Sequence, residues 1–310
     1  MTSWDLLYHL LRANFDDVKS EHAEVPAVQG GEGDGRYEYG CQVTGLHDLG
    51  AGKGIEVNFI KKDEPESTTT ADLLIAADGA SSTVRSLLLP DVKRTYAGYV
   101  AWRGTVPETK LSKIAASIFV ETMTIFWAPG HLILTYLIPG RAGSLETGER
   151  LANWVWYCDY IDGSPEHTEL MTDVDGKLHR FTVPVGKIAS SVWEKQKECA
   201  RKVLPPQFVE LVESTHVPFV QAITDVIAPQ CSFYEGRVLL LGDALAGFRP
   251  HTAASTSQAA FDAMLLAELI QGNIALKEFE KRCMNYAENV SRSGVQIGNR
   301  SQLGQHPRPG

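Results

Sequence analysis

Two stretches of the sequence decide the fold, and in each an apolar run ends where an aspartate stands next to a glycine. They are Asp72-Leu-Leu-Ile-Ala-Ala-Asp78-Gly79-Ala-Ser81-Ser82-Thr-Val-Arg85 and Arg237-Val-Leu-Leu-Leu-Gly242-Asp243-Ala. Their uninterrupted apolar residues are typical of strands that are buried on both faces of a parallel sheet. A carboxylate beside a glycine at the end of such a strand suits a ribose or a diphosphate, because glycine allows close approach to the backbone.

The sequence between these stretches has a different character from residue 91 onward. Long aromatic and β-branched runs linked by turn residues predict antiparallel strands at 96–106, 118–128, 132–138 and 153–160. The chain is therefore predicted to be α/β (α+β overall): an incomplete Rossmann-like nucleotide-binding domain with an inserted, mostly antiparallel sheet.

Other elements follow from turn and capping signals. Alternating residues at 37–43 and 55–60 predict two strands, joined by a hairpin connection at 45–54. Capping boxes at Thr2–Asp5 and Ser255–Gln258 predict helix starts. Two helices are expected within 186–213, broken at Pro205-Pro206, and a last one at about 276–291.

Composition excludes several classes of protein. A formal net charge of -9 argues against nucleic acid or an anionic membrane as the main partner. The five cysteines have no CxxC spacing and are odd in number, so we predict no disulfide framework, no metal site and a reducing, cytoplasmic location. The chain has neither an apolar signal core near Met1 nor a stretch suited to span a membrane.

The first Asp-Gly stretch resembles a fingerprint of the class A flavoprotein monooxygenases, the p-hydroxybenzoate hydroxylase-like family. The resemblance implies that Asp78 and Gly79 hold the region around the diphosphate of FAD. It also implies two alternatives for Arg85, which either favours an anionic group of the cofactor or is a solvated helix residue.

The second stretch, followed by Arg249-Pro250-His251 and a capped helix, resembles the second fingerprint of the same family. The resemblance implies that Asp243 accepts a hydrogen bond from ribityl or ribose hydroxyls of FAD and that Gly242 belongs to the same cofactor-binding site. It also implies that Pro250 and the amides that follow it lie beside the flavin. Unpaired amides at a helix start stabilise negative charge whatever the family. The amides are expected from Ala253, Ala254 and Ser255.

Two features of this second stretch leave questions open. The family pattern has glycines where Ala253 and Ser255 stand, so a Cβ is expected to restrict the approach of the flavin ring, and Ser255 is expected to act as an N-cap. Pro250 and His251 are the candidates for a catalytic role, although a purely structural loop histidine is as good an interpretation.

A third resemblance narrows the family. Tyr96-Ala-Gly-Tyr-Val-Ala-Trp102-Arg103-Gly, with the opening Thr2-Ser-Trp-Asp and the Arg249-Pro-His segment, is similar to the 2,6-dihydroxypyridine 3-hydroxylase branch. The similarity runs from Met1 to about Ala287. Trp102 and Arg103 are candidate substrate residues, and packing in a sheet core is the alternative.

The resemblance implies a domain division and an activity. Residues 1–90 and 222–300 are expected to form two parts of an FAD-binding domain, 91–221 a substrate-binding sheet domain, and 301–310 a disordered tail. The implied activity is hydroxylation of a small aromatic or heteroaromatic ring through a flavin C4a-hydroperoxide. FAD would be the cofactor, NAD(P)H the co-substrate, and a homodimer is compatible with this activity.

The segment that should precede these fingerprints is absent. No Gly-x-Gly-x-x-Gly turn follows a predicted strand, and the Gly-rich residues 30–35 have the wrong spacing and predict a mobile loop. We therefore expect a truncated chain that binds FAD weakly or not at all. The alternatives are a non-catalytic remnant acting as a binding module, and a flavoprotein oxidase or dehydrogenase.

Overall fold

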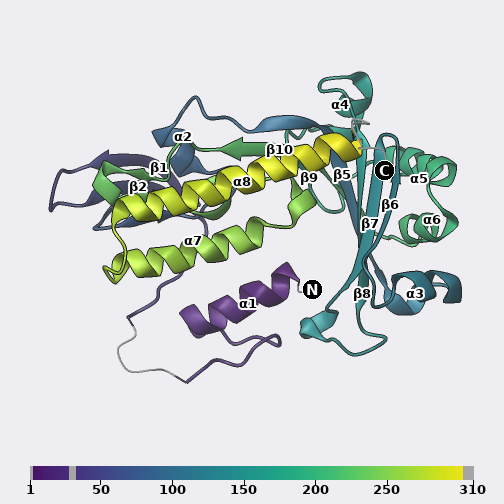
Figure 1. The fold of residues 1–310 in the computed structure, drawn as a ribbon, viewed down its shortest axis with the longest axis horizontal. Helices are drawn as coiled ribbons and strands as arrows, with labels where there is room; N and C mark the ends of the chain where they lie inside the picture. The colour runs from purple at the N-terminus through teal and green to yellow at the C-terminus, as the bar shows by residue number, and fades with distance from the viewer. Residues whose placement is uncertain (1–2, 28–32, 303–310) are drawn as a thin grey trace. The chain divides into compact units, whose positions relative to one another are not determined.

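The computed structural model describes residues 3–27 and 33–302, which form two compact units (Figure 1). Unit 1 comprises Met1–Glu38 and Gly98–Ala222, and unit 2 comprises Tyr39–Ala97 and Ile223–Gly310. The functional division at residues 90, 221 and 300 stays a prediction, because packing does not show what a unit binds. The expected tail lies largely outside the described residues.

Unit 1 is built on an antiparallel sheet, as the aromatic runs predict. Its strands follow the order β10-β5-β8-β7-β6, with β9 paired to β10. The strands are β5 (Thr95–Pro107), β6 (Thr124–Ala128), β7 (His131–Ile138), β8 (Leu151–Asp159), β9 (Thr182–Val183) and β10 (Phe219–Ile227). Trp102 pairs with Trp156 across β5 and β8, and both side chains are fully buried.

The helices of unit 1 include one where the sequence predicts a strand. The predicted strand at 118–128 is wrong in its first part: a helix ends at Phe119, and only the second part is β6. Helix α1 is capped by Ser3, whose hydroxyl accepts the Leu6 amide. The helices are α1 (Trp4–Phe15), α3 (Lys113–Phe119), α4 (Pro165–Met171), α5 (Ser190–Val203) and α6 (Pro206–Glu213). The expected break at Pro205-Pro206 is confirmed.

Unit 2 contains the two apolar runs as neighbouring parallel strands. Leu74, Ile75 and Ala76 of β4 pair with Val238, Leu239 and Leu240 of β12. Every residue of β12 is buried, whereas Ile75 is 40% exposed, so the expected burial of the first run on both faces is wrong. The reason is position, because β4 lies at the edge of the sheet β11-β12-β4. The strands are β4 (Leu74–Ala76), β11 (Ser232–Phe233) and β12 (Val238–Leu240).

A second sheet in unit 2 confirms the predicted hairpin with shifted bounds. It has the order β1-β2-β3 and is antiparallel. Its strands are β1 (Cys41–Asp48), β2 (Ile55–Lys61) and β3 (Ser67–Ala71). The strand β13 (Ala246–Gly247) pairs with the end of β10.

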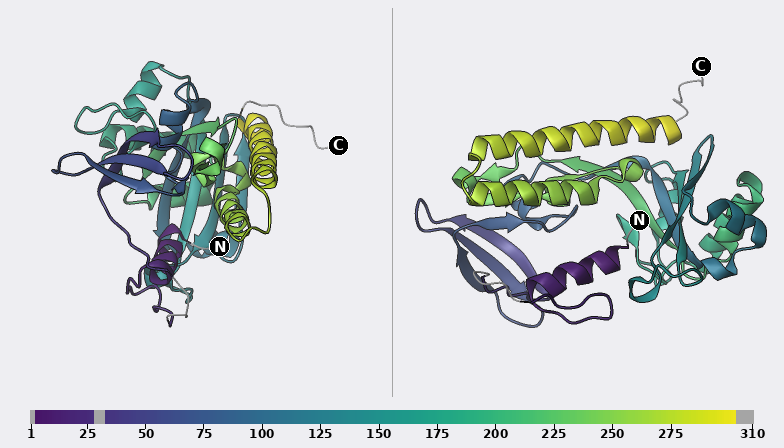
Figure 2. Two further views of the ribbon diagram at one scale, coloured as in Figure 1. Left: turned by 90° about the vertical axis from the view of Figure 1, so that its left-hand side faces the viewer. Right: turned by 60° about the horizontal axis from the view of Figure 1, so that its bottom comes forward.

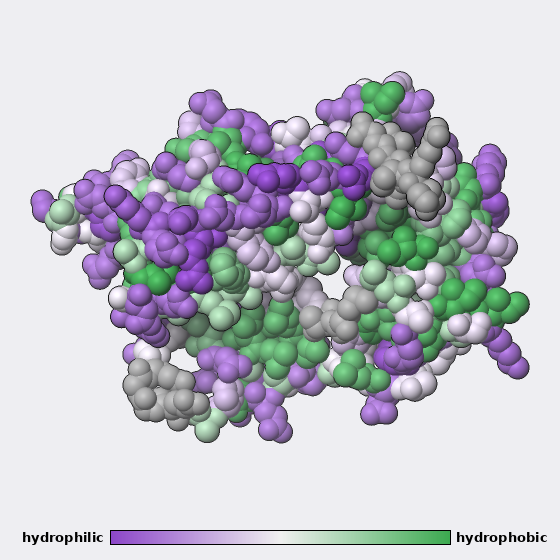
Figure 3. All heavy atoms as spheres, in the orientation of Figure 1, coloured by the Kyte–Doolittle hydropathy of each residue, from purple (hydrophilic) through white to green (hydrophobic). Residues whose placement is uncertain are grey.

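Two long helices pack beside the parallel strands of unit 2. α7 (Ser255–Ile270) and α8 (Leu276–Gln302) run side by side in both views of the ribbon (Figures 1 and 2). α8 is longer than the predicted helix at 276–291, and hydrophilic side chains cover its outward side (Figure 3). Its inward residues Phe279, Cys283 and Ala287 are fully buried in the core with β12. Among the described residues no helix is long and apolar enough to cross a membrane.

Candidate functional site

The first Asp-Gly stretch is organised by its own side chains. Asp78 accepts the amides of Thr83 and Val84 at 2.7 and 3.2 Å, and Ser82 accepts the Arg85 amide at 2.9 Å. Both side chains therefore cap the short helix α2 (Thr83–Leu88). Gly79 has φ +78°, a left-handed conformation that glycine adopts without strain. The pattern thus has a local folding role, and the contact of Asp78 with a diphosphate stays a prediction.

Arg85 joins the two fingerprint stretches. Its guanidinium donates to the carbonyl oxygens of Asp243 and Ala244 at 3.2 and 2.8 Å, and to that of Ala80 at 2.5 Å. The residue is 2% exposed, so the solvated alternative is wrong. Burial lowers the pKa of Arg85, and Asp78 and Asp243 partly offset that effect. Arg85 therefore fixes the backbone that carries Asp243.

Gly242 is held by two buried side chains of α7. Its amide donates to the Asp262 carboxylate at 2.9 Å, and its carbonyl accepts from the Gln258 amide at 3.1 Å. Gly242 has φ +56°, and a Cβ there would lie 3.3 Å from the Cβ of Ala259. A glycine is thus favoured in this turn, because its left-handed φ strains other residues and a Cβ would crowd Ala259 of α7.

Asp243 presents a half-buried carboxylate near the start of α7. Burial raises its pKa, while a hydrogen bond from Ser255 and the charges of Arg94 and Arg85 lower it. Ser255 is the first residue of α7 and Ala254 occupies the N-cap position, with no side-chain cap. The predicted capping role of Ser255 is therefore wrong, because its hydroxyl is engaged by Asp243.

A short turn leads into α7 and contains the remaining predicted residues. Pro250, His251 and Thr252 form a 3-10 turn, and Ala253 follows in a left-handed conformation with φ +50°. Burial lowers the pKa of His251 to about 4, so its imidazole is neutral at physiological pH. The first amides of α7 have no partner within the helix, and the helix dipole makes this end favourable for negative charge.

Replacing Ala253 with glycine is expected to stabilise the chain by about 0.5 kcal/mol. A left-handed conformation costs an L-residue about 1–2 kcal/mol, and the greater unfolded-state entropy of glycine offsets part of the gain. The matched control is Ala260→Gly, at an exposed position inside α7, which is expected to destabilise. Urea unfolding of both variants checks the prediction, and an A253G variant less stable than A260G would contradict it.

The two predicted substrate residues lie in unit 1. Trp102 is fully buried and packs against Trp193, with ring centroids 5.4 Å apart. The structure therefore gives Trp102 the core-packing role that the sequence left open beside pocket lining. Arg103 lies opposite Val155 in the sheet and is half-buried. Its contact with a substrate stays a prediction.

The sequence did not predict the roles that several residues have in the structure. Asp262 and Gln258 support Gly242 from 20 and 16 residues away. Arg94 donates to Thr224 at 3.0 Å and to Ser81 at 2.8 Å. In unit 1, Asp5, His9 and His22 form a polar cluster that could hold a metal ion. Only the helical spacing of Asp5 and His9 pointed to that cluster.

Comparison with known proteins agrees with this architecture. A family model described as "FAD binding domain-like" matches residues 96–225. The homologues and structural neighbours of the chain are class A FAD-dependent monooxygenases.

Individual relatives can be named within the family. The chain is 33% identical over 245 residues to the 2,6-dihydroxypyridine 3-monooxygenase of Paenarthrobacter nicotinovorans. The aligned region covers 77% of this chain and 59% of that relative. It is 24% identical to the 6-hydroxynicotinate 3-monooxygenase of Pseudomonas fluorescens, covering 75% and 51%. The solved structure of 2,6-dihydroxypyridine-3-hydroxylase from Arthrobacter nicotinovorans matches with a TM-score of 0.76 at 29% identity, covering 86% of this chain and 66% of that one. The chain thus spans between half and two thirds of these relatives.

Proposed function

We propose that this chain carries the flavin-ring and substrate-binding parts of an FAD-dependent monooxygenase that hydroxylates a small aromatic or heteroaromatic ring. The observation that carries the proposal is the half-buried Asp243 carboxylate beside the start of α7. Ser255 donates a hydrogen bond to it, and Arg85 holds the backbone carbonyl of the same residue. NAD(P)H as reductant, a homodimer and a cytoplasmic location belong to the same proposal. The free state of all five cysteines is consistent with a reducing compartment.

The residues present fit one end of FAD. Burial disfavours the ionised form of the Asp243 carboxylate, and hydrogen bonds from hydroxyl groups stabilise that form. The ribityl chain and the riboses of FAD supply such hydroxyl groups. The amides at the start of α7 would stabilise negative charge on the flavin ring. FAD, when bound, supplies the redox and oxygen chemistry, so the protein's share is to bind, orient and exclude water. No Gly-x-Gly-x-x-Gly turn is present among the 310 residues to hold the pyrophosphate.

A titration of the purified chain with FAD, followed by quenching of flavin fluorescence, tests the proposal. We expect saturable binding that is weaker than that of a flavoprotein with the complete pyrophosphate loop, because the ring end supplies only part of the contacts. NAD(P)H oxidation with hydroxypyridines and phenols as substrates would then separate a hydroxylase from an oxidase, since only a hydroxylase forms a hydroxylated product.

The second candidate is a non-catalytic binding module, because a fold does not by itself specify catalysis. A folded chain that shows no quenching at high FAD concentration would support that module and contradict the first proposal. Size-exclusion chromatography with and without FAD, on the same samples, reports whether the chain forms a homodimer.

A further inference from the structure

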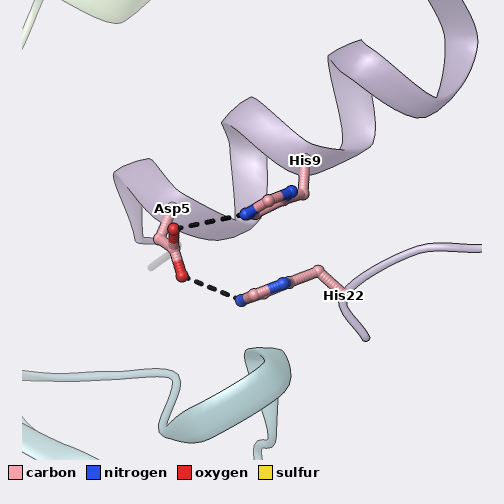
Figure 4. A group of neighbouring side chains, drawn as sticks. All are labelled: Asp5, His9 and His22. Carbon is pink, nitrogen blue, oxygen red and sulfur yellow. Dashed lines mark ion pairs between the residues drawn. The ribbon is translucent and has the colours of Figure 1, made fainter. Parts of the chain in front are cut away.

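Three side chains of unit 1, outside the proposed flavin site, have the composition of a transition-metal site. Asp5 lies in the first turn of α1, His9 lies one turn further along, and His22 lies in the segment that follows the helix. Each offers one ligand atom, and these atoms all lie within 4.8 Å of one another. Figure 4 shows both imidazoles with a nitrogen directed at the Asp5 carboxylate.

The arrangement is held by contacts that bring both imidazoles to the same carboxylate. The Nε2 atom of His22 lies 2.8 Å from one oxygen of Asp5, and Nε2 of His9 lies 3.6 Å from the other. The two rings stack with centroids 4.3 Å apart and an interplanar angle of 7°. The Nδ1 atoms of both rings are buried without a hydrogen-bond partner among the described residues. The Nε2 atoms are the nitrogens available for coordination, because they face the Asp5 carboxylate while the Nδ1 atoms are buried.

We propose that Asp5, His9 and His22 bind a divalent transition-metal ion such as Zn²⁺. Two imidazole nitrogens and one carboxylate oxygen are a common three-residue ligand set for zinc, with water in the fourth position. The His22 side chain is 10% exposed and that of Asp5 is 60% exposed, which leaves the carboxylate side open to water. Imidazole and carboxylate together favour zinc, nickel or copper over magnesium and calcium, which prefer oxygen ligands.

Binding requires a small closure of the cluster. Ligand atoms on one tetrahedral zinc ion lie roughly 3.3 Å apart, given zinc–ligand distances of about 2.0–2.1 Å. The stacked rings must therefore tilt so that both Nε2 lone pairs converge. A ring nitrogen that contacts the carboxylate carries a proton, so metal binding would move the proton of each neutral ring from Nε2 to Nδ1 and replace the two contacts by metal bonds. The ion would tie α1 to the segment that contains His22.

The test is a zinc titration of the full chain, purified without a histidine tag and treated with a chelator, in competition with a chromogenic zinc ligand. We expect one tight site per chain in the parent. Removing even an outer-shell partner of a metal costs 10–100-fold in affinity, so His9→Gln and His22→Gln are each expected to weaken binding by at least about 100-fold. Cobalt in place of zinc should give visible absorption bands in the parent that both variants lose.

A control variant and a third site variant make the test decisive. His216→Gln removes an exposed histidine of the same unit and should leave affinity unchanged. Asp5→Asn serves as a third variant if either histidine variant unfolds, which circular dichroism of the metal-free proteins reports. Absence of a tight site in the parent overturns the proposal. So does a site that survives in all three variants, since the metal would then lie elsewhere, for example on cysteines. Neither outcome depends on flavin binding.

Discussion

Asp243→Ala is expected to weaken binding of FAD by about 10- to 100-fold. A hydrogen bond to a charged group is worth about 1.5–3 kcal/mol, and each 1.4 kcal/mol is a factor of ten in affinity. Ser255 donates to the Asp243 carboxylate beside the start of α7, and Arg85 holds the backbone carbonyl of Asp243. The loss should appear in the fluorescence titration as a higher dissociation constant with the same final quenching.

The stability of the same variant separates binding from folding. Burial raises the pKa of Asp243, so the folded chain without ligand holds a proton there more tightly than the unfolded chain. Its stability therefore falls as pH rises from the ordinary aspartate pKa through the raised one. At neutral pH, D243A is expected to unfold at the same or a higher urea concentration than the parent. The exposed carboxylate of Asp91 gives the control D91A, which should alter neither quantity. Equal FAD affinity in D243A and the parent would remove Asp243 from the site.

The sequence predicts the helices and strands of this chain where the signals lie within a short stretch of residues. The two apolar runs pair as parallel strands because their residues are buried together in one core. The strand predicted at 118–128 is wrong in its first part because apolar residues such as Ile118 and Phe119 are compatible with a helix as well as a strand. The helix is favoured there because Ser112 caps its start and because Ala115 and Phe119, four residues apart, are buried on one face.

The candidate site is less predictable because its supports are distant in sequence. Ser255 begins a helix and fits a capping box, but the left-handed Ala253 places Ala254 at the N-cap and leaves the Ser255 hydroxyl to Asp243. Asp262 supports Gly242 only because α7 packs on the turn that contains it. Such contacts depend on tertiary packing, which no local pattern encodes. The same holds for His22, which reaches His9 through a loop.

Arg85→Lys is expected to destabilise the chain by about 2–3 kcal/mol. The planar guanidinium of Arg85 donates to three carbonyl oxygens, two of which precede the turn into α7. A lysine ammonium is a compact point charge that cannot reach all three, and each buried acceptor left without a partner costs about 1–3 kcal/mol. Desolvation adds to the loss, since burial already lowers the pKa of Arg85 and lysine is more strongly hydrated.

The measurement is urea unfolding of R85K beside R292K, in which an exposed arginine of α8 changes in the same way. R292K is expected within about 0.5 kcal/mol of the parent. If R85K were as stable as R292K, the carbonyl contacts of Arg85 would contribute little to the stability of the chain. The positive charge of Arg85 alone would then account for its place beside Asp243. If R85K is destabilised as expected, it should also weaken FAD binding more than R292K does, because the backbone that carries Asp243 then loses its brace. We expect R85K to lose both stability and affinity for FAD, and D243A to lose affinity without losing stability. That difference would identify Arg85 as the residue that positions the site and Asp243 as the residue that contacts the cofactor.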